Sequence, residues 1–397
     1  MYRLEPTLQN YAWGMSGVIE TMLGRPVTDE PVAEAWWGAH PSAPALATAM
    51  HAVRADEVGL YPGDVVPLDR LIARDPAAML GHDVVVRWER LPYLLKVLAI
   101  AKPLSLQVHP TLAQADEGFR REQAIGVPLD AAARTFKDRS HKPEMIVALT
   151  PMTLLAGFRK APAVAADLMR LGLECTRAWA EELNNSTEPT VALREYVSTV
   201  LTHPDAGDAV ARLAEVGTGA DASEGLAVAA ATLADFPGDV GALVALALNV
   251  VRLEPGEACF TEAGVVHSYQ SGLGVEIMAN SDNVVRAGLT PKQVDIPLLV
   301  ALTDGTPGPP PRVAPQVDGP VTHYPAPVGE FALTVVRDGA ARVAPGPRIV
   351  LAVDGTVDVR AGSGGLGLRR GQAAFVPYCD GELHVDAHGM AVVAEVP

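Results

Sequence analysis

The sequence predicts a mainly β protein that contains an inserted α-helical segment and ends in a second, small β-sandwich. Short runs of alternating apolar and polar residues, typical of strands, occur before residue 158 and again after residue 251. Between them, the chain is rich in alanine and leucine at helical spacing. A proline-rich segment at 306–311 separates the last group of short strands from the rest.

These changes in composition predict a division into three parts. Residues 1–158 and 251–305 would form one β domain that carries the metal site, and residues 159–250 would form an inserted helical domain. Residues 306–397 would form a linker and a C-terminal sandwich without a metal site. A chain of 397 residues, 49% of them hydrophobic, is long enough to bury several cores.

The bulk properties exclude some partners. A formal charge of -16 argues against nucleic acid and against anionic membranes, since either partner needs an extended basic face. The start of the chain has no basic region followed by an apolar run, as a secretory signal would have. Three widely spaced cysteines argue against a disulfide framework. We therefore expect a cytoplasmic protein.

Potential metal ligands and basic groups gather between residues 96 and 144. In a strand over residues 104–109, side-chain alternation would place Ser105, Gln107 and His109 on one face. In the stretch that starts at His141, the same alternation aims Lys142 and Glu144 together and turns His141 the opposite way. An amine and a carboxylate would then share one wall of a pocket.

Two flanking segments can be assigned from their pattern. Residues 91–100 have the composition of a buried strand, and Lys96 is the only charge in it, so Lys96 needs a partner or a function. Residues 111–123 carry alternating charges and helix-forming residues, which predicts a short exposed helix capped by Thr111.

Polar residues return after the helical segment. A short strand between the turns at 255–256 and 263–264 leads to His267, with Tyr269 on the same face. Glu276 follows, and then a polar run from residue 281 that contains Arg286 and Lys292.

Three of the five tryptophans lie in residues 9–14 and 34–40 of this aromatic-poor chain. Large aromatic side chains contribute mainly through buried area, which favours core packing for each of them. Trp13 is the best candidate for a contact with a ligand.

Gln107, His109, Glu144 and His267 together offer an amide oxygen, two imidazoles and a carboxylate. Such a set suits a divalent metal of borderline softness such as zinc. Two histidines with one carboxylate also describe the site of a non-haem iron oxygenase, so spacing alone leaves both alternatives open.

Several of these strings, in order along the chain, resemble type I mannose-6-phosphate isomerase (phosphomannose isomerase), a family of the cupin superfamily. The matching segments are residues 105–110, 141–145, 156–159, 266–269 and 281–292, together with 9–14 and 34–41. The resemblance covers roughly residues 1–160 and 250–300 by motif. One departure from the family pattern is Trp37, which we expect to affect the shape of the pocket.

The resemblance implies two cupin (jelly-roll) β-sandwiches and one zinc ion per chain, in an enzyme that interconverts mannose 6-phosphate and fructose 6-phosphate. Its metal ligands fall on Gln107, His109, Glu144 and His267. Its catalytic or phosphate-proximal arginine falls on Arg286, and residues that line its sugar-phosphate pocket fall on Lys96, Ser105 and Lys292.

An aldose–ketose isomerase moves a proton between C1 and C2 through an enediol, and it needs an acid–base group to do so. Lys142, beside Glu144 and near a bound cation, could lose its proton and serve as the base. Glu276 is a second candidate, although a structural carboxylate paired with Arg286 explains it equally well. We place Trp13 and Tyr269 among the residues that contact the substrate.

We expect a monomer whose partner is a small phosphosugar. Two alternatives to the isomerase stay open: a cupin-type non-haem iron oxygenase and a non-catalytic sugar-phosphate sensor. The oxygenase would not require Gln107 or the lysine and arginine set, and the sensor would not require both a metal and a base.

Overall fold

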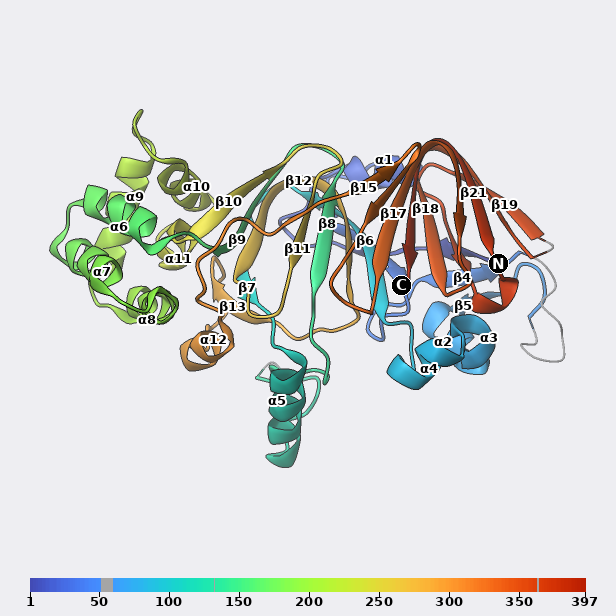
Figure 1. Cartoon of the computed structure of the whole chain (residues 1–397), viewed down its shortest axis with the longest axis horizontal. Coiled ribbons are helices and arrows are strands. Elements are labelled where there is room, and N and C mark those ends of the chain that lie inside the picture. The colour runs from blue at the N-terminus through green and yellow to red at the C-terminus, as the bar shows by residue number, and fades with distance from the viewer. Residues whose placement is uncertain (51–59, 132, 363) are drawn as a thin grey trace.

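A computed structural model describes residues 1–50, 60–131, 133–362 and 364–397 of the chain. Two large antiparallel sheets form the body of the molecule, and a bundle of helices lies at one end of it (Figure 1). The prediction of a mainly β protein with a helical insertion is confirmed.

The first sheet carries the segments that resemble the enzyme family. Its strand order is β14 (Arg312–Val313), β11 (Ala258–Thr261), β8 (Glu144–Ala148), β12 (His267–Ala279), β6 (Tyr93–Ile100), β3 (Glu34–Gly38) and β2 (Thr7–Gln9). The long strand β12 also pairs through its first residues with β7 (Leu106–Val108) and β9 (Met152–Phe158). β7 pairs in turn with β13 (Val285–Gly288), and β9 pairs with β10 (Leu248–Leu253). β12 therefore connects the two ends of this sheet.

The second sheet combines the two ends of the chain. Its order is β15 (Gln316–Asp318), β16 (Val321–Tyr324), β17 (Ala332–Val343), β21 (Leu383–Glu395), β18 (Arg348–Ala361), β20 (Ala373–Val376), β1 (Tyr2–Glu5), β4 (Leu46–Ala49) and β5 (Val65–Pro67), with β19 (Gly364–Arg369) paired to β18. β1 lies between β20 and β4 in this sheet. The beginning of the chain thus contributes strands to the C-terminal sandwich as well as to the first sheet.

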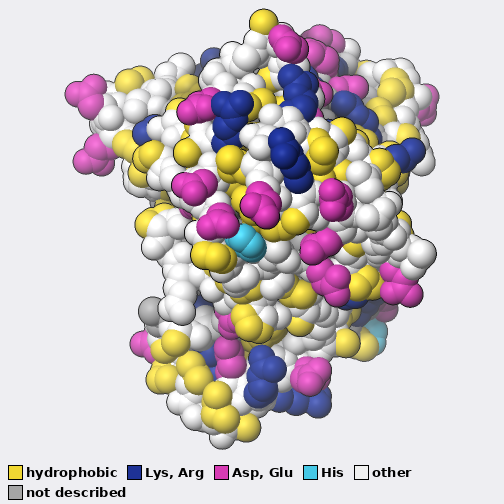
Figure 2. Space-filling view, turned by 90° about the vertical axis from the view of Figure 1, so that its left-hand side faces the viewer, with side chains coloured by type: hydrophobic (Ala, Val, Ile, Leu, Met, Phe, Trp, Pro, Cys, Tyr) yellow, Lys and Arg dark blue, Asp and Glu magenta, His cyan; other side chains and the backbone are white. Residues whose placement is uncertain are grey.

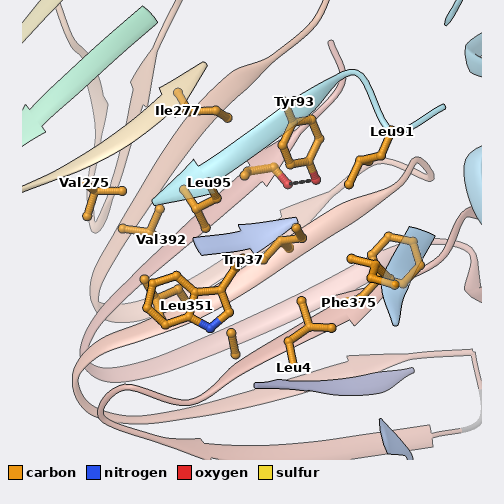
Figure 3. Close-up of a cluster of buried hydrophobic side chains, with 14 of the residues drawn as sticks. Leu4, Trp37, Leu91, Tyr93, Leu95, Val275, Ile277, Leu351, Phe375 and Val392 are labelled. Carbon is orange, nitrogen blue, oxygen red and sulfur yellow. Dashed lines mark hydrogen bonds between the residues drawn. The ribbon is translucent and has the colours of Figure 1, made fainter. Parts of the chain in front are cut away.

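The largest buried cluster lies between the two sheets (Figure 3). Side chains from the first sheet pack against others from the second, among them Leu95, Ile277, Leu351, Phe375 and Val392. Trp37 is fully buried in this cluster, where its side chain packs in the core between the two sheets. The hydroxyl oxygen of Tyr93 lies within hydrogen-bonding distance of two carbonyl oxygens across the interface, that of Ala394 at 3.0 Å and that of Pro347 at 3.1 Å, and its single proton can be donated to either.

The inserted segment folds as helices that share a separate apolar core. They are α6 (Ala161–Leu171), α7 (Glu174–Asn185), α8 (Pro189–Thr202), α9 (Ala206–Gly217), α10 (Glu224–Thr232) and α11 (Gly241–Leu246). Gly172 adopts a left-handed conformation with φ 75° that ends α6 and separates it from α7.

The other helices flank the sheets. They are α1 (Val18–Met22), α2 (Leu68–Arg74), α3 (Pro76–Leu80), α4 (His82–Trp88), α5 (Leu112–Ala124) and α12 (Ile296–Leu302). α5 begins after Thr111, whose side chain forms a capping box with Gln114, so the predicted helix and its cap are confirmed.

The outer end of the helical bundle presents a mixed surface. Figure 2 shows acidic and basic side chains interspersed with apolar ones over this end. Within the described ranges, every helix is too short or too polar to cross a membrane.

Candidate metal centre and active site

Sheet register brings together residues that are far apart in the sequence. In the antiparallel pairing, His267 of β12 lies opposite Gln107 of β7, and Gln107 lies opposite Arg286 of β13. Residues that are directly opposite each other point to the same face of a sheet. The predicted ligands His267 and Gln107 and the predicted catalytic Arg286 therefore form one row across three strands.

The other two predicted ligands complete a buried cluster. Ligand atoms of His109, Glu144 and His267 lie within 4.8 Å of one another, and all three side chains are at most 2% exposed. One carboxylate oxygen of Glu144, Oε2, lies 3.1 Å from Nε2 of His267, and the other, Oε1, lies 3.5 Å from Nε2 of His109. The amide Nε2 of Gln107 lies 3.2 Å from Nε2 of His267.

Both imidazoles are oriented by backbone carbonyls behind them. Nδ1 of His109 lies 2.8 Å from the carbonyl oxygen of Asn283, and Nδ1 of His267 lies 2.9 Å from that of Val265. If each Nδ1 donates its proton there, both Nε2 lone pairs face the centre of the cluster, as in metal-ligating histidines.

The strongest indication that this cluster binds a cation is the Nε2 atom of His109. This buried atom has no hydrogen-bond partner within the described part of the chain. Burial first, and then the charge of Lys142, lower the pKa of His109 to about 4, so its imidazole is neutral near pH 7. A neutral, buried imidazole nitrogen with an unused lone pair can coordinate a metal ion.

The donor set fits zinc. Two imidazoles, one carboxylate and one amide oxygen are nitrogen and oxygen ligands of the kind that zinc takes. Rotation of the Gln107 amide exchanges its oxygen and nitrogen and presents the oxygen to the cluster. The bound ion would also satisfy the orphan nitrogen of His109.

Lys142 is placed as the alternation of side chains predicts. Its Nζ donates a hydrogen bond of 2.6 Å to Oε1 of Glu144, and the lysine is 8% exposed. Burial opposes the charge of Glu144, but Lys142 and the two histidines hold the pKa of this carboxylate well below its usual value. His141 turns away and bonds Glu330 at 2.9 Å, which confirms its predicted orientation.

A second buried cluster of charged side chains lies on β6, β12 and β3. Lys96 of β6 is opposite Glu276 of β12, and its Nζ lies 3.0 Å from Glu276 and 3.5 Å from Glu34. Burial opposes the charge of Lys96, but the surrounding carboxylates of Glu276, Glu34 and Glu144 raise its pKa. Lys96 thus has the partner that its burial requires.

The alternative in which Glu276 pairs with Arg286 is wrong, because the partner of Glu276 is Lys96. Arg286 is half-buried, and burial lowers its pKa. Among the described residues its guanidinium has no ion-pair or hydrogen-bond partner. It is therefore free to meet an anionic ligand beside Gln107.

The remaining predicted residues lie at different distances from this centre. The ring of Tyr269 is 6.2 Å from that of His267, and burial together with Glu276 and Glu144 raises the pKa of Tyr269. Trp13 is half-buried, stacks on Tyr11 and packs against the buried cluster that contains Tyr269. Ser105 is half-buried directly before β7. Lys292 is exposed in the segment after β13, and no described contact joins its ammonium to the other site residues.

Sequence reasoning missed the residue that supports His109 from behind. The buried side chain of Asn283 donates to the carbonyl oxygens of Asp138 at 2.9 Å and Ser140 at 2.8 Å, and it accepts from the backbone N–H of Lys137 at 2.7 Å. These bonds join the segment that leads to Lys142 to the carbonyl that orients His109. The only signal for Asn283 is its place in the polar run that starts at residue 281.

Replacement of Asn283 by alanine is expected to weaken zinc binding by about 10–100-fold, the usual cost of removing a partner behind a metal ligand. The control is Asn249→Ala, because the amide of Asn249 also donates to several backbone carbonyls, but between β9 and β10. Competition with a chelator measures the zinc dissociation constant of each variant. Equal weakening in both variants would show that Asn283 contributes only to general stability.

Comparison with known proteins gives a consistent result. The family model of the type I phosphomannose isomerase catalytic domain matches residues 1–161. The chain is 33% identical to the mannose-6-phosphate isomerase of Escherichia coli (strain K12), over 98% of each protein. It is 34% identical to that of Salmonella typhimurium (strain LT2), over 100% of this chain and 99% of the relative.

A solved structure is also similar to this chain over its whole length. A structure of the Salmonella typhimurium mannose 6-phosphate isomerase bound to fructose 6-phosphate and zinc aligns with a TM-score of 0.89 and 32% identity, over 100% of this chain and 99% of that one.

Proposed function

This chain belongs to the type I phosphomannose isomerase family, and from that premise we propose that it interconverts D-mannose 6-phosphate and D-fructose 6-phosphate with the help of zinc. The observation that carries the proposal is the buried cluster of His109, Glu144 and His267, with the unsatisfied nitrogen of His109 facing its centre. Zinc held there would supply a Lewis acid for the reaction. We assign one ion per chain, held by these three residues and Gln107.

The reaction transfers a proton between C1 and C2 through a cis-enediol, and we assign the transfer to Lys142. Its amine is buried beside Glu144, to which Nζ donates a hydrogen bond of 2.6 Å. Arg286, half-buried and without a carboxylate partner among the described residues, stabilises the negative charge that develops on the enediol oxygens. Glu276 remains the second candidate for proton transfer, but its bond to Lys96 favours a positioning role.

The substrate contacts are proposals as well. We assign the packing of the sugar ring to Trp13 and Tyr269, since Trp13 packs against the apolar cluster that contains Tyr269 and the Tyr269 ring lies 6.2 Å from that of His267. We assign the phosphate to Ser105 and Lys292, with Lys96 as a less favoured contact because two carboxylates already share its ammonium.

Two alternatives are less well supported. A non-haem iron oxygenase needs two histidines and one carboxylate, but it gives no reason for Gln107 or for the buried Lys142. A sugar-phosphate sensor would need neither a complete ligand set nor an acid–base group, and this chain has both. The relatives over its whole length are mannose-6-phosphate isomerases.

The test is conversion of mannose 6-phosphate to fructose 6-phosphate by the purified protein, before and after chelation and with zinc added back. Activity that disappears with chelation and returns with zinc is the expected result. A zinc-loaded protein that is inactive, but consumes oxygen when ferrous iron and candidate substrates are added, would support the oxygenase instead.

We also propose that the enzyme acts as a monomer in the cytoplasm. All three cysteines are free thiols, as a reducing compartment maintains them. The division at residues 158, 251 and 305 remains a proposal, and limited proteolysis at the proline-rich segment 306–311 tests the last boundary. Since β1 pairs with β20, the two parts that flank this segment should stay associated after cleavage.

A further inference from the structure

A cavity of about 560 Å³ lies outside the metal centre, between α4, the start of α5 and the segment that leads to Lys142. α4 and α5 both lie along the lower edge of the molecule in Figure 1. Its lining consists of residues 87–90 with Leu112, Ser140 and Glu330, and we name it the Arg90 pocket. Its volume falls within the range of small-molecule sites.

The Arg90 pocket contains two arginines that lack an acidic partner. The guanidinium of Arg87 lies 4.3 Å from the centre of the Trp88 ring, and Nη2 of Arg90 donates to Oγ of Ser140 at 2.9 Å. In the described part of the chain neither guanidinium lies within ion-pair distance of a carboxylate.

Gly329 lies against the flexible end of the exposed Arg87 side chain, because a Cβ atom at Gly329 would lie 2.7 Å from both terminal guanidinium nitrogens. Glu89, between the two arginines, adopts a left-handed conformation with φ 60° that ends α4. Non-glycine residues seldom adopt this conformation, and it costs about 1 kcal/mol or more.

Two carboxylates, Glu89 and Glu330, also line the cavity, but among the described residues neither forms an ion pair with Arg87 or Arg90. The carboxylate of Glu330 accepts hydrogen bonds from His141 at 2.9 Å and from the side chain of Trp88. Glu89 is exposed. The unpaired positive charge therefore faces the cavity, where a guanidinium can bind a phosphate oxygen pair.

We propose that the Arg90 pocket binds a phosphate group, either inorganic phosphate or the phosphate of a small monoester, at a site separate from the substrate. Arg87 and Arg90 would hold the phosphate oxygens and Ser140 would donate its hydroxyl proton. The ring of Trp88 and the side chain of Leu112 would cover the apolar part of an ester.

The position of Ser140 connects this pocket to the metal centre. Ser140 lies two residues before Lys142, and its carbonyl oxygen accepts from Asn283, whose own carbonyl orients His109. A phosphate that replaces the direct Arg90–Ser140 hydrogen bond therefore shifts the segment that leads to the proposed base. We infer that phosphate in this pocket lowers kcat. This effect on kcat rests on the proposed isomerase function, but the binding of phosphate to the pocket does not depend on that function.

The test is equilibrium dialysis of the zinc-loaded full chain against radiolabelled inorganic phosphate. The variant is Arg87→Gln/Arg90→Gln, and the matched control is Arg170→Gln/Arg177→Gln, which removes two exposed arginines from the helical bundle. The pocket variant is expected to bind one phosphate fewer per chain than the parent and the control, with any phosphate at the substrate site retained. Equal stoichiometry and affinity in the pocket variant and the control would overturn the proposal.

A second variant changes the expected result in the opposite direction. Glu89→Gln removes an exposed negative charge from the same turn and should tighten phosphate binding several-fold, roughly as expected for a nearby like charge. Unchanged affinity in Glu89→Gln, together with unchanged stoichiometry in the pocket variant, would mean that phosphate binds elsewhere. Since dialysis requires no turnover, a failed isomerase assay and a failed phosphate site remain distinguishable.

Kinetics tests the connection to the metal centre. Phosphate added to the parent enzyme should raise the apparent KM by competition at the substrate site and should also lower kcat. In the pocket variant only the effect on KM should remain. If added phosphate lowered kcat equally in the pocket variant and in the parent enzyme, the Arg90 pocket and the metal centre would not be connected in this way.

Discussion

Replacement of His267 by alanine is expected to raise the zinc dissociation constant by roughly 100-fold or more. A zinc site with four protein ligands contributes about 10–16 kcal/mol, so one ligand is worth about 3 kcal/mol, or about two orders of magnitude in affinity. His267 is 1% exposed, and its Nε2 faces Glu144 at 3.1 Å. The metal content of the protein after dialysis measures the loss.

The matched control for this prediction is His388→Ala, which truncates an exposed histidine of β21 in the second sheet. Zinc content should be unchanged there. Glu144→Gln should resemble His267→Ala, because the substitution removes the charge that both Lys142 and the ion require. Full zinc content in His267→Ala would contradict the assignment of the metal centre.

The local part of the site could be predicted from the sequence because side-chain alternation in a strand is a strong constraint. It correctly placed Lys142 beside Glu144 and turned His141 away from them. It also predicted that Lys96, the only charge in a buried strand, needs a partner. Each of these conclusions depends on residues within a few positions of one another or on burial alone.

Distant partners could not be predicted, because they depend on strand register. The row of His267, Gln107 and Arg286 exists only because β12 and β13 both pair with β7. Spacing along the chain gives no information about that register, and the resemblance to a known family supplied the ligand set instead. The partner of Glu276 was left open for the same reason.

Two features of the fold escaped the sequence pattern. β1 joins the C-terminal sheet through β20, across almost the entire chain, and a four-residue alternating run cannot show which sheet it enters. Asn283 acts through hydrogen bonds of its side chain to loop carbonyls, and an asparagine in a polar run looks like any turn residue before those carbonyls are placed.

Lys142→Met is expected to retain zinc and to lower kcat by about 10²–10⁴-fold, the usual contribution of a positioned acid–base group. Methionine keeps most of the length and apolar character of the lysine stem, so the buried site stays filled. Glu144 then loses one hydrogen-bonding partner, but the two histidines and the ion still hold it. The prediction therefore separates the base from the ligands, since His267→Ala loses metal and Lys142→Met does not.

Two measurements decide this assignment. Zinc content and kcat are compared with those of Lys137→Met, since among the described residues the ammonium of Lys137 bonds the carbonyl oxygens of Leu129 and Ala131 and no others. Exchange of the C2 proton of mannose 6-phosphate with deuterated solvent then reports proton removal directly. If Lys142→Met holds zinc, stays slow and still exchanges that proton at the parent rate, Lys142 acts after proton abstraction. The base must then be another group, and Glu276 is the next to replace.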